Sequence, residues 1–521
     1  MSPNTPNSPI DIGPLQDERI GKIHDLEGLG IICFPERFER NSDTQTIQNI
    51  DNLPQRDVSA LFAEDKESYE TVSLAGRLMG YRTHGKIAFG DLQDRSGRIQ
   101  LAFAENAFTI ETGRGEEKME FASESETVSS FAFVKKYIDL GDIIGVRGIP
   151  FITKRGEKSI LVSNFQLLTK SINPLPDKHE GLKDIEMRYR KRYLDMLNPE
   201  IQRLMERRSK FFSSMRRYLE DLNFMELDTP TLENTTGGAD ARPFMTHYNA
   251  YDRDVFLRIS AGELWQKRLM VAGFEKTFEI GKIFRNEGVS PEHAQDYMQM
   301  EVYWAYADYN DMMRLVRDMY LHVIDATYGK REFFINGHTV DFSTDWQILD
   351  YQTLIKERTG IDIFTSTEEE IIARLRELGA HYEAGNRPRL VDYLWKYIRK
   401  SIAGPAFLIN EPKFTSPLAK SDINNPHITH RFHVILAGSE VGNGYSELND
   451  PIDQLERFES QQALRDAGDD EAQMADYDFV EALMHGMPPT AGFGVSERLF
   501  AFLEGKPIKE CQPFPYVKPR N

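Results

Sequence analysis

One stretch of the 521-residue chain concentrates side chains that could bind a nucleotide. It reads FRNEGVSPEHAQDYMQMEVYWAYADY and spans residues 284–309. An arginine fork such as that of Arg285 can grip a phosphate through parallel hydrogen bonds. His293, on the short loop that follows, can contact further phosphate oxygens, and the ring of Tyr297 can stack on a base. Glu301 lies four residues beyond Tyr297. Taken singly, each of these residue types more often serves packing or surface charge. The interpretation as a nucleotide-binding segment therefore rests on their combination.

A second candidate is HITHRFH, in which His427, His430 and His433 are spaced three residues apart. On a strand, His427 and His433 would share a face and His430 would point away. A metal site built from all three histidines is therefore not favoured. The chain contains no GxxxxGK[ST], GxSxG or HExxH sequence, and no GxGxxG between a strand and a helix. A P-loop, a Rossmann site, a serine hydrolase elbow and a zincin site are thus not indicated.

The composition excludes several classes of protein. With 40% hydrophobic and 28% charged residues, the chain has the profile of an ordinary globular protein. Two cysteines, Cys33 and Cys511, cannot make a disulfide framework or a cysteine-rich zinc site. No apolar run approaches the roughly 18 residues of a membrane span, and the N-terminus lacks the features of a secretory signal. We expect a cytoplasmic protein with no membrane partner.

Charge is distributed unevenly along the chain. The formal net charge is −19, which argues against nucleic acid binding over the whole surface. Residues 183–217 nevertheless carry eleven basic and five acidic residues, and residues 72–104 carry five basic and two acidic ones. Such runs are usually solvated faces. They are also compatible with polyanion contact confined to two zones.

The elements that must position these residues fall into two regions. Between residues 69 and 172, β-rich runs at 72–80, 86–94, 98–104, 142–153 and 159–169 surround a polar insertion at 109–128 and a helix at 129–140. Three strands, a helix and two strands is the order of a five-stranded oligonucleotide-binding (OB) barrel, although any small β-barrel could share it. Residues 1–68 are predicted to be a flexible tail, at 1–18, followed by a helical extension.

Residues 173–184 contain two prolines and turn residues, which predicts a linker. Beyond it, from 185 to 521, a helix is predicted at 199–222. Long apolar runs follow at 224–232, 255–260, 276–284, 297–307, 430–441 and 490–502. This pattern predicts an α+β fold, with a mostly antiparallel sheet flanked by helices.

The stretch at 284–309 resembles motif 2 of the class II aminoacyl-tRNA synthetases, FRxE-loop-HxxxFxxxE. MELDTPTL, which contains Pro230, resembles the end of motif 1, and AGFGVSERLFAFL at 491–503 resembles motif 3. The three motifs occur in the family's order. The resemblance is most specific to lysyl-tRNA synthetases and covers residues from about 70 to 521. It is carried by GRIQL, PLPDKHEGLKD, RYRKRYLD, GGADARPF, THYNA, FLRIS, GFEKTFEIGKIFRNEG, VGNGYSELNDPIDQ, DAGDDEA and HGMPPTAGFG.

This resemblance implies that the chain activates lysine with ATP and transfers the lysyl group to the 3′ end of tRNA(Lys). Arg285 and Arg498 are the implied catalytic residues. Arg285 would hold the substrate carboxylate and α-phosphate, and Arg498 and His293 the outer phosphates. Tyr297 would stack on adenine. The full set implied for ATP is Arg285, Asn286, Glu287, His293, Tyr297, Glu440 and Arg498.

The implied lysine pocket agrees with elementary electrostatics. A buried ammonium needs carboxylate partners, because an unpaired buried charge costs several kcal/mol. By resemblance, Glu447 and Tyr303 would hold the ε-ammonium, and Glu263 and the backbone of Gly238 the α-ammonium. Glu301, Asn443 and Tyr445 complete the implied pocket.

The resemblance also implies a metal, a tRNA contact and an assembly. Glu440 would bind Mg²⁺, with Mn²⁺ as a possible replacement, and His433 occupies the position of the family's second metal carboxylate. Arg82, Phe89 and Gln100 lie where the family reads the anticodon, by stacking and base-edge hydrogen bonds. Motif 1 implies a homodimer.

Several residues depart from the family's pattern near the active site. Histidine at 433 is a poor Mg²⁺ ligand but suits softer ions. Glu292 replaces an arginine, and Ala294 replaces an asparagine. Motif 3 is one residue shorter than usual, so the match of Arg498 to the family's arginine depends on where the missing residue falls. FLRISAGEL is one residue longer than the family's segment, so the match of Glu263 depends on where the additional residue falls.

Two alternatives to a working lysine–tRNA ligase remain. One is a catalytically altered paralogue that binds tRNA or an aminoacyl-adenylate. The other is a simple OB-type single-strand binder, which leaves some 350 residues unexplained. The intact set of Glu447, Tyr303 and Asn443 favours the enzyme, whereas the changes near the phosphates favour the paralogue.

Overall fold

The computed structural model describes residues 12–56, 70–105, 108–113, 115–117, 121–122, 127–128, 130–176, 182–235, 237–238, 241–288, 290–383, 385–466 and 474–519. It divides into two compact units, Met1–Gln202 and Arg203–Asn521. Residues 1–11 of the predicted tail at 1–18, linker residues 177–181 and much of the 109–128 insertion lie outside the described residues. The tail prediction was wrong at 14–18, where helix α1 (Pro14–Gly28) begins with a proline in its first turn. The predicted domain boundaries at 68, 172 and 184 stay predictions.

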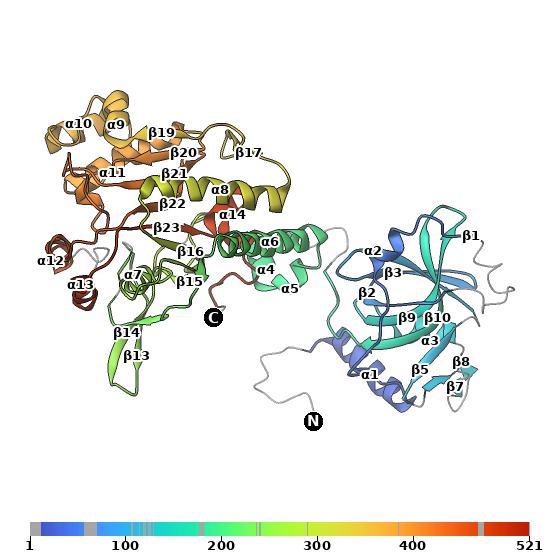
Figure 1. The fold of residues 1–521 in the computed structure, drawn as a ribbon. Coiled ribbons are helices and arrows are strands. Elements are labelled where there is room, and N and C mark those ends of the chain that lie inside the picture. Colours follow the sequence, from blue (N-terminus) through green and yellow to red (C-terminus); the bar gives the residue numbers. More distant parts are fainter. Residues whose placement is uncertain are drawn as a thin grey trace. The chain divides into compact units, whose positions relative to one another are not determined.

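The first unit is built on a closed β-barrel (Figure 1). Its strands run in the order β9-β2-β3-β4-β10, and β10 pairs back to β9, which closes the barrel. The predicted OB barrel is confirmed. The barrel strands are β2 (Val72–His84), β3 (Ile87–Gln93), β4 (Arg98–Ala104), β9 (Ile143–Thr153) and β10 (Lys158–Thr169), with α3 (Ser130–Tyr137) between β4 and β9.

Shorter elements extend this unit. β5 (Thr109–Thr112) pairs in parallel with β10, so the predicted polar insertion begins as a strand added to the barrel. Helix α1 packs Ile23 and Leu26 into the barrel core. The remaining elements are α1 (Pro14–Gly28), α2 (Thr44–Gln48), β1 (Gln55–Arg56), β6 (Gly115–Glu117), β7 (Phe121–Ala122), β8 (Thr127–Val128), α4 (Ile185–Arg190) and α5 (Arg192–Asp195).

The second unit is organised around an eight-stranded sheet in the order β11-β15-β16-β23-β22-β21-β20-β19. Only the two outermost pairings are parallel, so the predicted mostly antiparallel sheet is confirmed. The strands are β11 (Met225–Glu226), β15 (Lys276–Phe284), β16 (Asp296–Ala305), β19 (Gln347–Asp350), β20 (Ala406–Ile409), β21 (Arg431–Leu436), β22 (Ser439–Ser446) and β23 (Thr490–Ser496).

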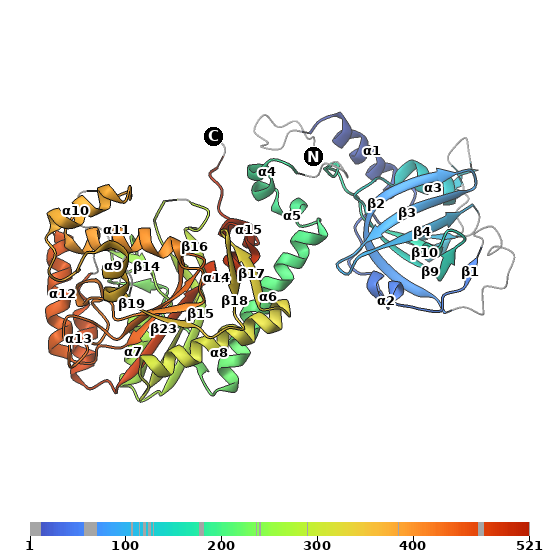
Figure 2. The same ribbon diagram turned by 90° about the horizontal axis from the view of Figure 1, so that it is seen from above.

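Helices cover both faces of this sheet (Figure 2). One face packs against α6 (Pro199–Asp221), α8 (Tyr309–Tyr328) and α14 (Arg498–Glu504), and the other against α7 (Glu263–Val271), α12 (Pro451–Asp466) and α13 (Tyr477–Met484). Helices α9 (Tyr351–Thr359), α10 (Glu368–Glu377) and α11 (Arg387–Ile398) form a further cluster against β20 and β21. The other elements are β12 (Leu232–Glu233), β13 (Met245–Tyr248), β14 (Arg253–Leu257), β17 (Glu332–Ile335), β18 (His338–Asp341) and α15 (Ile508–Cys511).

Local chemistry explains where the long helices begin and end. Asp308 and Asp311 form a reciprocal capping box at the start of α8, and Gly329 ends it in the left-handed conformation. Buried residues recur at helical spacing along one side of α8, from Met312 to Ile324, which fixes the face turned to the sheet. None of the described helices has both the length and the apolar character of a membrane span.

Three predicted strand runs were wrong in part. The run at 430–441 is a hairpin, because Ala437 and Gly438 both adopt positive φ and reverse the chain between β21 and β22. The run at 490–502 is a strand only to Ser496, after which α14 begins at Arg498. In the run at 224–232, only Met225–Glu226 and Leu232 are in strands, because Pro230 lacks an N–H and Thr229 hydrogen-bonds to Glu279 instead.

Candidate active site

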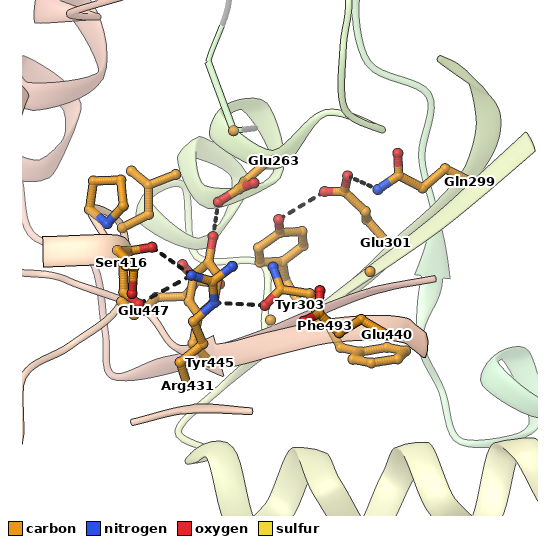
Figure 3. Close-up of a pocket in the computed structure, with 18 of the residues that line it drawn as sticks. Glu263, Gln299, Glu301, Tyr303, Ser416, Arg431, Glu440, Tyr445, Glu447 and Phe493 are labelled. Carbon is orange, nitrogen blue, oxygen red and sulfur yellow. Dashed lines mark hydrogen bonds between the residues drawn. The ribbon is translucent and has the colours of Figure 1, made fainter. Parts of the chain in front are cut away.

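The second unit contains a polar cleft with two connected lobes. The large lobe has a volume of about 400 Å³ and the small lobe about 210 Å³. Five residues line both lobes, which makes the cleft continuous: Arg285, Gln299, Glu440, Asn443 and Gly494. The large lobe also contains all the residues predicted to hold lysine, and Figure 3 shows most of them.

Strand β16 supplies a row of side chains along the floor of the cleft. Tyr297, Gln299, Glu301 and Tyr303 alternate with residues such as Val302 that face the core. Because side chains on a strand alternate between its two faces, one strand can carry an aromatic ring into the small lobe and a carboxylate into the large lobe. The four-residue spacing of Tyr297 and Glu301 noted in the sequence has this physical origin.

Glycines on the neighbouring strand β23 create the space above that row. Gly492 and Gly494 face the cleft, while Phe493 and Val495 face the core. A Cβ atom on Gly492 would lie only 2.2 Å from Oε1 of Glu447. Any larger residue at this position would therefore displace the carboxylate from the large lobe.

A β-bulge on β22 orients two more residues toward the cleft. His433 pairs with Asn443, and Ile435 pairs with Glu440. Between these two pairs, β22 has two residues opposite a single residue of β21. The extra residue reverses the alternation between Glu440 and Asn443, and both side chains line the cleft. Without the bulge, Glu440 would face the opposite side of the sheet.

Three buried carboxylates give the large lobe its negative charge. Glu263, Glu301 and Glu447 are only 5%, 3% and 2% exposed. Burial raises the pKa of Glu301 to about 8, and the charge of Glu263 adds to the increase. Burial also raises the pKa of Glu447 to about 8, although the ammonium of Lys267 acts in the opposite direction. A lobe with these groups is suited to a ligand that brings in positive charge.

Hydrogen bonds fix the orientation of these carboxylates. Glu301 accepts from the backbone N–H of Ala261 at 2.8 Å, from Nε2 of Gln299 at 2.9 Å and from the hydroxyl of Tyr303 at 3.0 Å. The hydroxyl of Tyr445 donates to Glu263. The side chains in the lobe are thus oriented before any ligand arrives.

FLRISAGEL, which is one residue longer than the family's segment, leads into helix α7. Gly262 caps that helix with φ of 78°, and a Cβ there would lie 2.1 Å from Oγ1 of Thr229. Only glycine fits this conformation and this close approach. Glu263 then begins α7 and lines the large lobe.

The cleft includes residues that the sequence did not single out. Arg431 donates from Nε to Oδ1 of Asn443 at 2.9 Å and lies 3.3 Å from Oε2 of Glu411. Gln299 and Lys267 contact the buried carboxylates directly. Lys267 lies four residues after Glu263 on α7, and residues at that spacing share a helix face, but no helix was predicted there from the sequence.

The small lobe gathers the cationic and aromatic groups. It is lined by Arg285, His293, Tyr297 and Arg498, together with Glu287. Nε of Arg285 donates to the carbonyl of Ile259 at 3.2 Å, and its guanidinium lies 6.0 Å from the ring centre of Tyr297. Such a lobe can hold a polyphosphate beside a stacked base.

The shortened motif 3 still delivers Arg498 to this lobe. Arg498 is the first residue of α14, directly after Glu497. Glu497 is buried, accepts from Arg208 at 2.6 Å and accepts from the backbone N–H of Met298 at 3.1 Å. The guanidinium of Arg498 contacts the carboxylate of Glu292 across the lobe.

Glu440 and His433 form a pair of donors at the edge of the small lobe. Nδ1 of His433 lies 3.8 Å from Oε2 of Glu440 and has no hydrogen-bond partner among the described residues. Nε2 of His433 lies 2.9 Å from Oε1 of Glu411. Burial alone would raise the pKa of Glu440, but the charges of His433 and Arg399 lower it to about 2, so the carboxylate is ionised.

This pair fits a divalent cation that completes its coordination with oxygens from a bound phosphate. Glu411 would then hold His433 through its other nitrogen, as carboxylates commonly do for metal-bound histidines. No group of three or more potential metal-binding side chains occurs within the described ranges. The protein alone therefore supplies only part of a metal site.

The other predicted residues lie apart from this constellation. Asn286 lines neither lobe, and its backbone N–H donates to the carbonyl of Arg242 at 2.8 Å. The three histidines of HITHRFH have different partners: His430 stacks on Tyr309, His427 lies beside Phe364, and His433 contacts Glu411.

A second candidate surface lies on the barrel of the first unit. Arg82 pairs with Phe89 across β2 and β3, and its guanidinium lies 5.7 Å from the phenyl ring. Gln100 shares that face and accepts from the hydroxyl of Ser159 at 3.0 Å. Phe89 borders a small apolar cluster of Ala102, Phe151 and Leu161. An exposed cation beside aromatic and apolar groups suits stacking of unpaired bases.

Comparison with known proteins agrees with both regions. A family model described as tRNA synthetases class II (D, K and N) matches residues 184–518, and one described as OB-fold nucleic acid binding domain matches residues 72–168. A lysine–tRNA ligase of Roseiflexus sp. (strain RS-1) is 41% identical over 521 residues, covering 98% of this chain and 100% of the relative. Another, from Thermotoga maritima, is 40% identical and covers 97% of this chain and 96% of its own. A third, from Methanoculleus marisnigri, is 42% identical over 96% and 94% of the two chains.

Proposed function

The chain belongs to the class II tRNA synthetase family (D, K and N), and we infer from its full-length relatives that it is a lysine–tRNA ligase. It activates lysine with ATP and transfers the lysyl group to tRNA. The observation that carries the choice of lysine is the large lobe, in which three buried carboxylates face a cavity that could accept two ammonium groups.

We propose that the two lobes divide the substrates between them. Lysine would occupy the large lobe, with its ε-ammonium at Glu447 and Tyr303 and its α-ammonium at Glu263 and the Gly238 backbone. Glu301, Asn443 and Tyr445 would complete its surroundings. ATP would occupy the small lobe, with adenine on Tyr297 and Glu287 at the base edge.

The first step would join the two lobes. A carboxylate oxygen of lysine attacks the α-phosphorus of ATP, the bond from that phosphorus to the β-bridging oxygen breaks, and pyrophosphate leaves. Arg285 lines both lobes, so it could hold the lysine carboxylate against the α-phosphate. Catalysis would then rest on positioning and charge neutralisation rather than on a protein nucleophile. In the second step, a ribose hydroxyl of the tRNA 3′ end attacks the carbonyl carbon of the lysyl-adenylate, the bond from that carbon to the phosphate oxygen breaks, and AMP leaves with loss of the hydroxyl proton.

Glu440 and His433 would hold a divalent cation on the ATP phosphates. When bound, the ion would neutralise charge on the phosphates during displacement. Mg²⁺ prefers an all-oxygen environment, whereas an imidazole nitrogen favours transition-metal ions such as Mn²⁺.

The metal proposal leads to a prediction about His433. The His433→Glu variant is expected to lower the ratio of activity with Mn²⁺ to activity with Mg²⁺ by roughly tenfold. Metal titrations of ATP–pyrophosphate exchange would measure this ratio. His430→Gln serves as the matched control, because His430 pairs with Asp422 and lines neither lobe. An unchanged ratio in the His433→Glu variant would count against His433 as a metal ligand.

Lysine binding should depend on pH. The raised pKa values of Glu301 and Glu447 mean that protons remain on these carboxyls at neutral pH in the empty pocket. An arriving ammonium favours the ionised carboxylates, so binding should release protons and tighten as the pH rises from about 6 to 8. Calorimetry in buffers of different ionisation enthalpy would detect the release. Proton uptake, or no exchange of protons, would contradict the prediction.

The barrel is proposed to read the anticodon through Arg82, Phe89 and Gln100. Phe89→Ala should weaken tRNA(Lys) binding by roughly tenfold to a hundredfold, because loss of a stacked base costs about 1–3 kcal/mol. Lysine-dependent pyrophosphate exchange should be unaffected, since that reaction needs no tRNA. Filter binding and exchange assays on the same preparation would separate the two effects. Equal loss of both would indicate a folding defect.

We also propose a homodimer and a cytoplasmic location. The dimer is supported by exposed apolar side chains at the motif-1 segment, including Met225 on the edge strand β11 and Leu232 on β12. The location follows from the proposed role in charging tRNA for protein synthesis.

Lysine-dependent ATP–pyrophosphate exchange tests the proposed function directly. We expect exchange with lysine and not with aspartate or asparagine, first in Mg²⁺ and then in Mn²⁺. No exchange with either ion, in folded protein that still binds lysine, would instead support the catalytically altered paralogue.

A further inference from the structure

A fully buried lysine side chain lies behind the carboxylates of the large lobe. Lys267, on α7, is 1% exposed. Its Nζ atom lies 2.8 Å from Oε1 of Glu263 and 2.7 Å from Oε2 of Glu447. The rings of Tyr445 and Phe479 lie 5.3 Å and 5.8 Å from the same nitrogen. Lys267 itself does not line the cavity.

We propose that Lys267 is a positioning residue that sets lysine specificity by holding one oxygen of Glu263 and one oxygen of Glu447, which leaves the second oxygen of each for the substrate. This inference rests on the proposed lysine–tRNA ligase function. It assigns a role to a residue that would not touch either substrate.

The geometry of the two carboxylates supports this division. Lys267 contacts Oε2 of Glu447, and the other oxygen, Oε1, is the atom that a Cβ on Gly492 would approach to 2.2 Å at the cavity wall. Lys267 also contacts Oε1 of Glu263, while Oε2 of that residue lies 2.9 Å from the position of a Cβ on Gly238. Both glycines line the large lobe. One ammonium therefore holds two carboxylates whose second oxygens lie beside two different glycines of the cavity wall.

The charge balance of the lobe points to the same role. Glu263, Glu301 and Glu447 would contribute three negative charges when ionised, and Lys267 contributes one positive charge. The remaining two charges equal the two ammonium groups of lysine, whose carboxylate is left for Arg285. Arg431 and Glu440 also line the lobe but do not alter this balance, because Arg431 lies 3.3 Å from Glu411 and Glu440 lies 3.2 Å from the guanidinium of Arg399. Without Lys267, the lobe would keep an uncompensated buried charge even when lysine is bound.

The first test is the Lys267→Met variant, in which KM for lysine should rise by roughly 100-fold in pyrophosphate exchange. KM for ATP should stay within about threefold, because Lys267 is remote from the small lobe. The ratio of kcat/KM for lysine to kcat/KM for norleucine, which lacks the ε-ammonium, should also fall in this variant. A KM for lysine within threefold of the wild-type value would overturn the inference.

Arg268→Met is the matched control. Arg268 is the next residue on α7 and pairs with Asp476 at 3.0 Å, but it contacts neither Glu263 nor Glu447. Its loss removes a neighbouring ion pair while leaving the substrate carboxylates in place. KM for lysine should stay within about threefold. An increase as large as that of Lys267→Met would show a general packing effect and overturn the specific role.

Chemical rescue distinguishes positioning from a purely structural role. Lys267→Ala removes three methylene groups and the ammonium, which propylammonium can replace within the vacated space. Added propylammonium should restore lysine-dependent exchange at least tenfold, whereas 1-propanol should not. Equal effects of both compounds, or none from either, would overturn the inference. If Lys267→Met does not fold, Lys267→Gln, which keeps a polar group at this position, takes its place. Its KM for lysine should also rise by roughly 100-fold, and a value within threefold of the wild-type KM would overturn the inference.

Failure of this inference differs from failure of the proposed function. If the wild-type protein exchanges pyrophosphate with lysine but Lys267→Met has an unchanged KM for lysine, the proposed role of Lys267 is wrong and the proposed enzyme function stands. Wild-type protein that shows no lysine-dependent exchange would remove both.

Discussion

The Glu447→Gln variant is expected to lose about two to four orders of magnitude in kcat/KM for lysine in ATP–pyrophosphate exchange. Glu447 is buried and contacts Lys267, and its free oxygen faces the large lobe. Glutamine has nearly the same shape but no charge, so a bound ε-ammonium would lose its counter-ion at a buried position. Breaking a buried ion pair in this way costs about 3–5 kcal/mol, which corresponds to the stated loss.

The pattern of kinetic effects should identify the site of the defect. KM for ATP should change little, because Glu447 does not line the small lobe. Glu456→Gln is a suitable control, since that residue is exposed on α12, the helix that follows the loop after Glu447. Unchanged lysine kinetics in Glu447→Gln would mean that lysine is not bound at this carboxylate. A comparable rise in KM for ATP would point to wider disruption.

The alternation of residues on a strand made much of the site predictable. In YMQMEVYWA, every second residue from Tyr297 to Tyr303 is aromatic or polar, and the structure directs these side chains into the cleft. The glycines of AGFG are likewise two apart, so both face the same cavity. A period of two is visible in the sequence, and it is also the geometric rule of the sheet.

The parts of the site that the sequence did not reveal depend on strand register and on contacts between residues far apart in the chain. The bulge that turns Glu440 into the cleft depends on the register between β21 and β22, which no local pattern specifies. Arg431 contacts Glu411 from a segment 20 residues away. No local pattern distinguishes Lys267, whose proposed role depends on Glu447, 180 residues later.

The departures from the family's pattern have different structural outcomes. Glu263 begins α7 and lines the large lobe despite the longer segment before it, and Glu497 anchors the start of α14 so that Arg498 enters the small lobe. Neither change displaces a predicted side chain from the cleft. Glu292 is different, because its carboxylate contacts the guanidinium proposed to bind the outer phosphates of ATP.

Arg498→Ala is expected to reduce kcat/KM for ATP by about 10²–10³-fold, with little change in KM for lysine. Arg498 lines only the small lobe, where its guanidinium would neutralise the outer phosphates and stabilise the leaving pyrophosphate. Removing one such preorganised donor typically costs two to three orders of magnitude in rate. Pyrophosphate exchange at varied ATP concentrations measures the effect.

Glu292→Gln provides the complementary test of the same contact. Glu292 competes with ATP for Arg498, so removing its charge should lower KM for ATP by several-fold. The effect should grow from AMP to ADP to ATP in competition assays, because only the outer phosphates would meet Arg498. In the Arg498→Ala background, Glu292→Gln should give a smaller improvement, since its partner is absent. An equal improvement in both backgrounds would mean that Glu292 acts by general repulsion, and no improvement in either would leave the contact without a role in ATP binding.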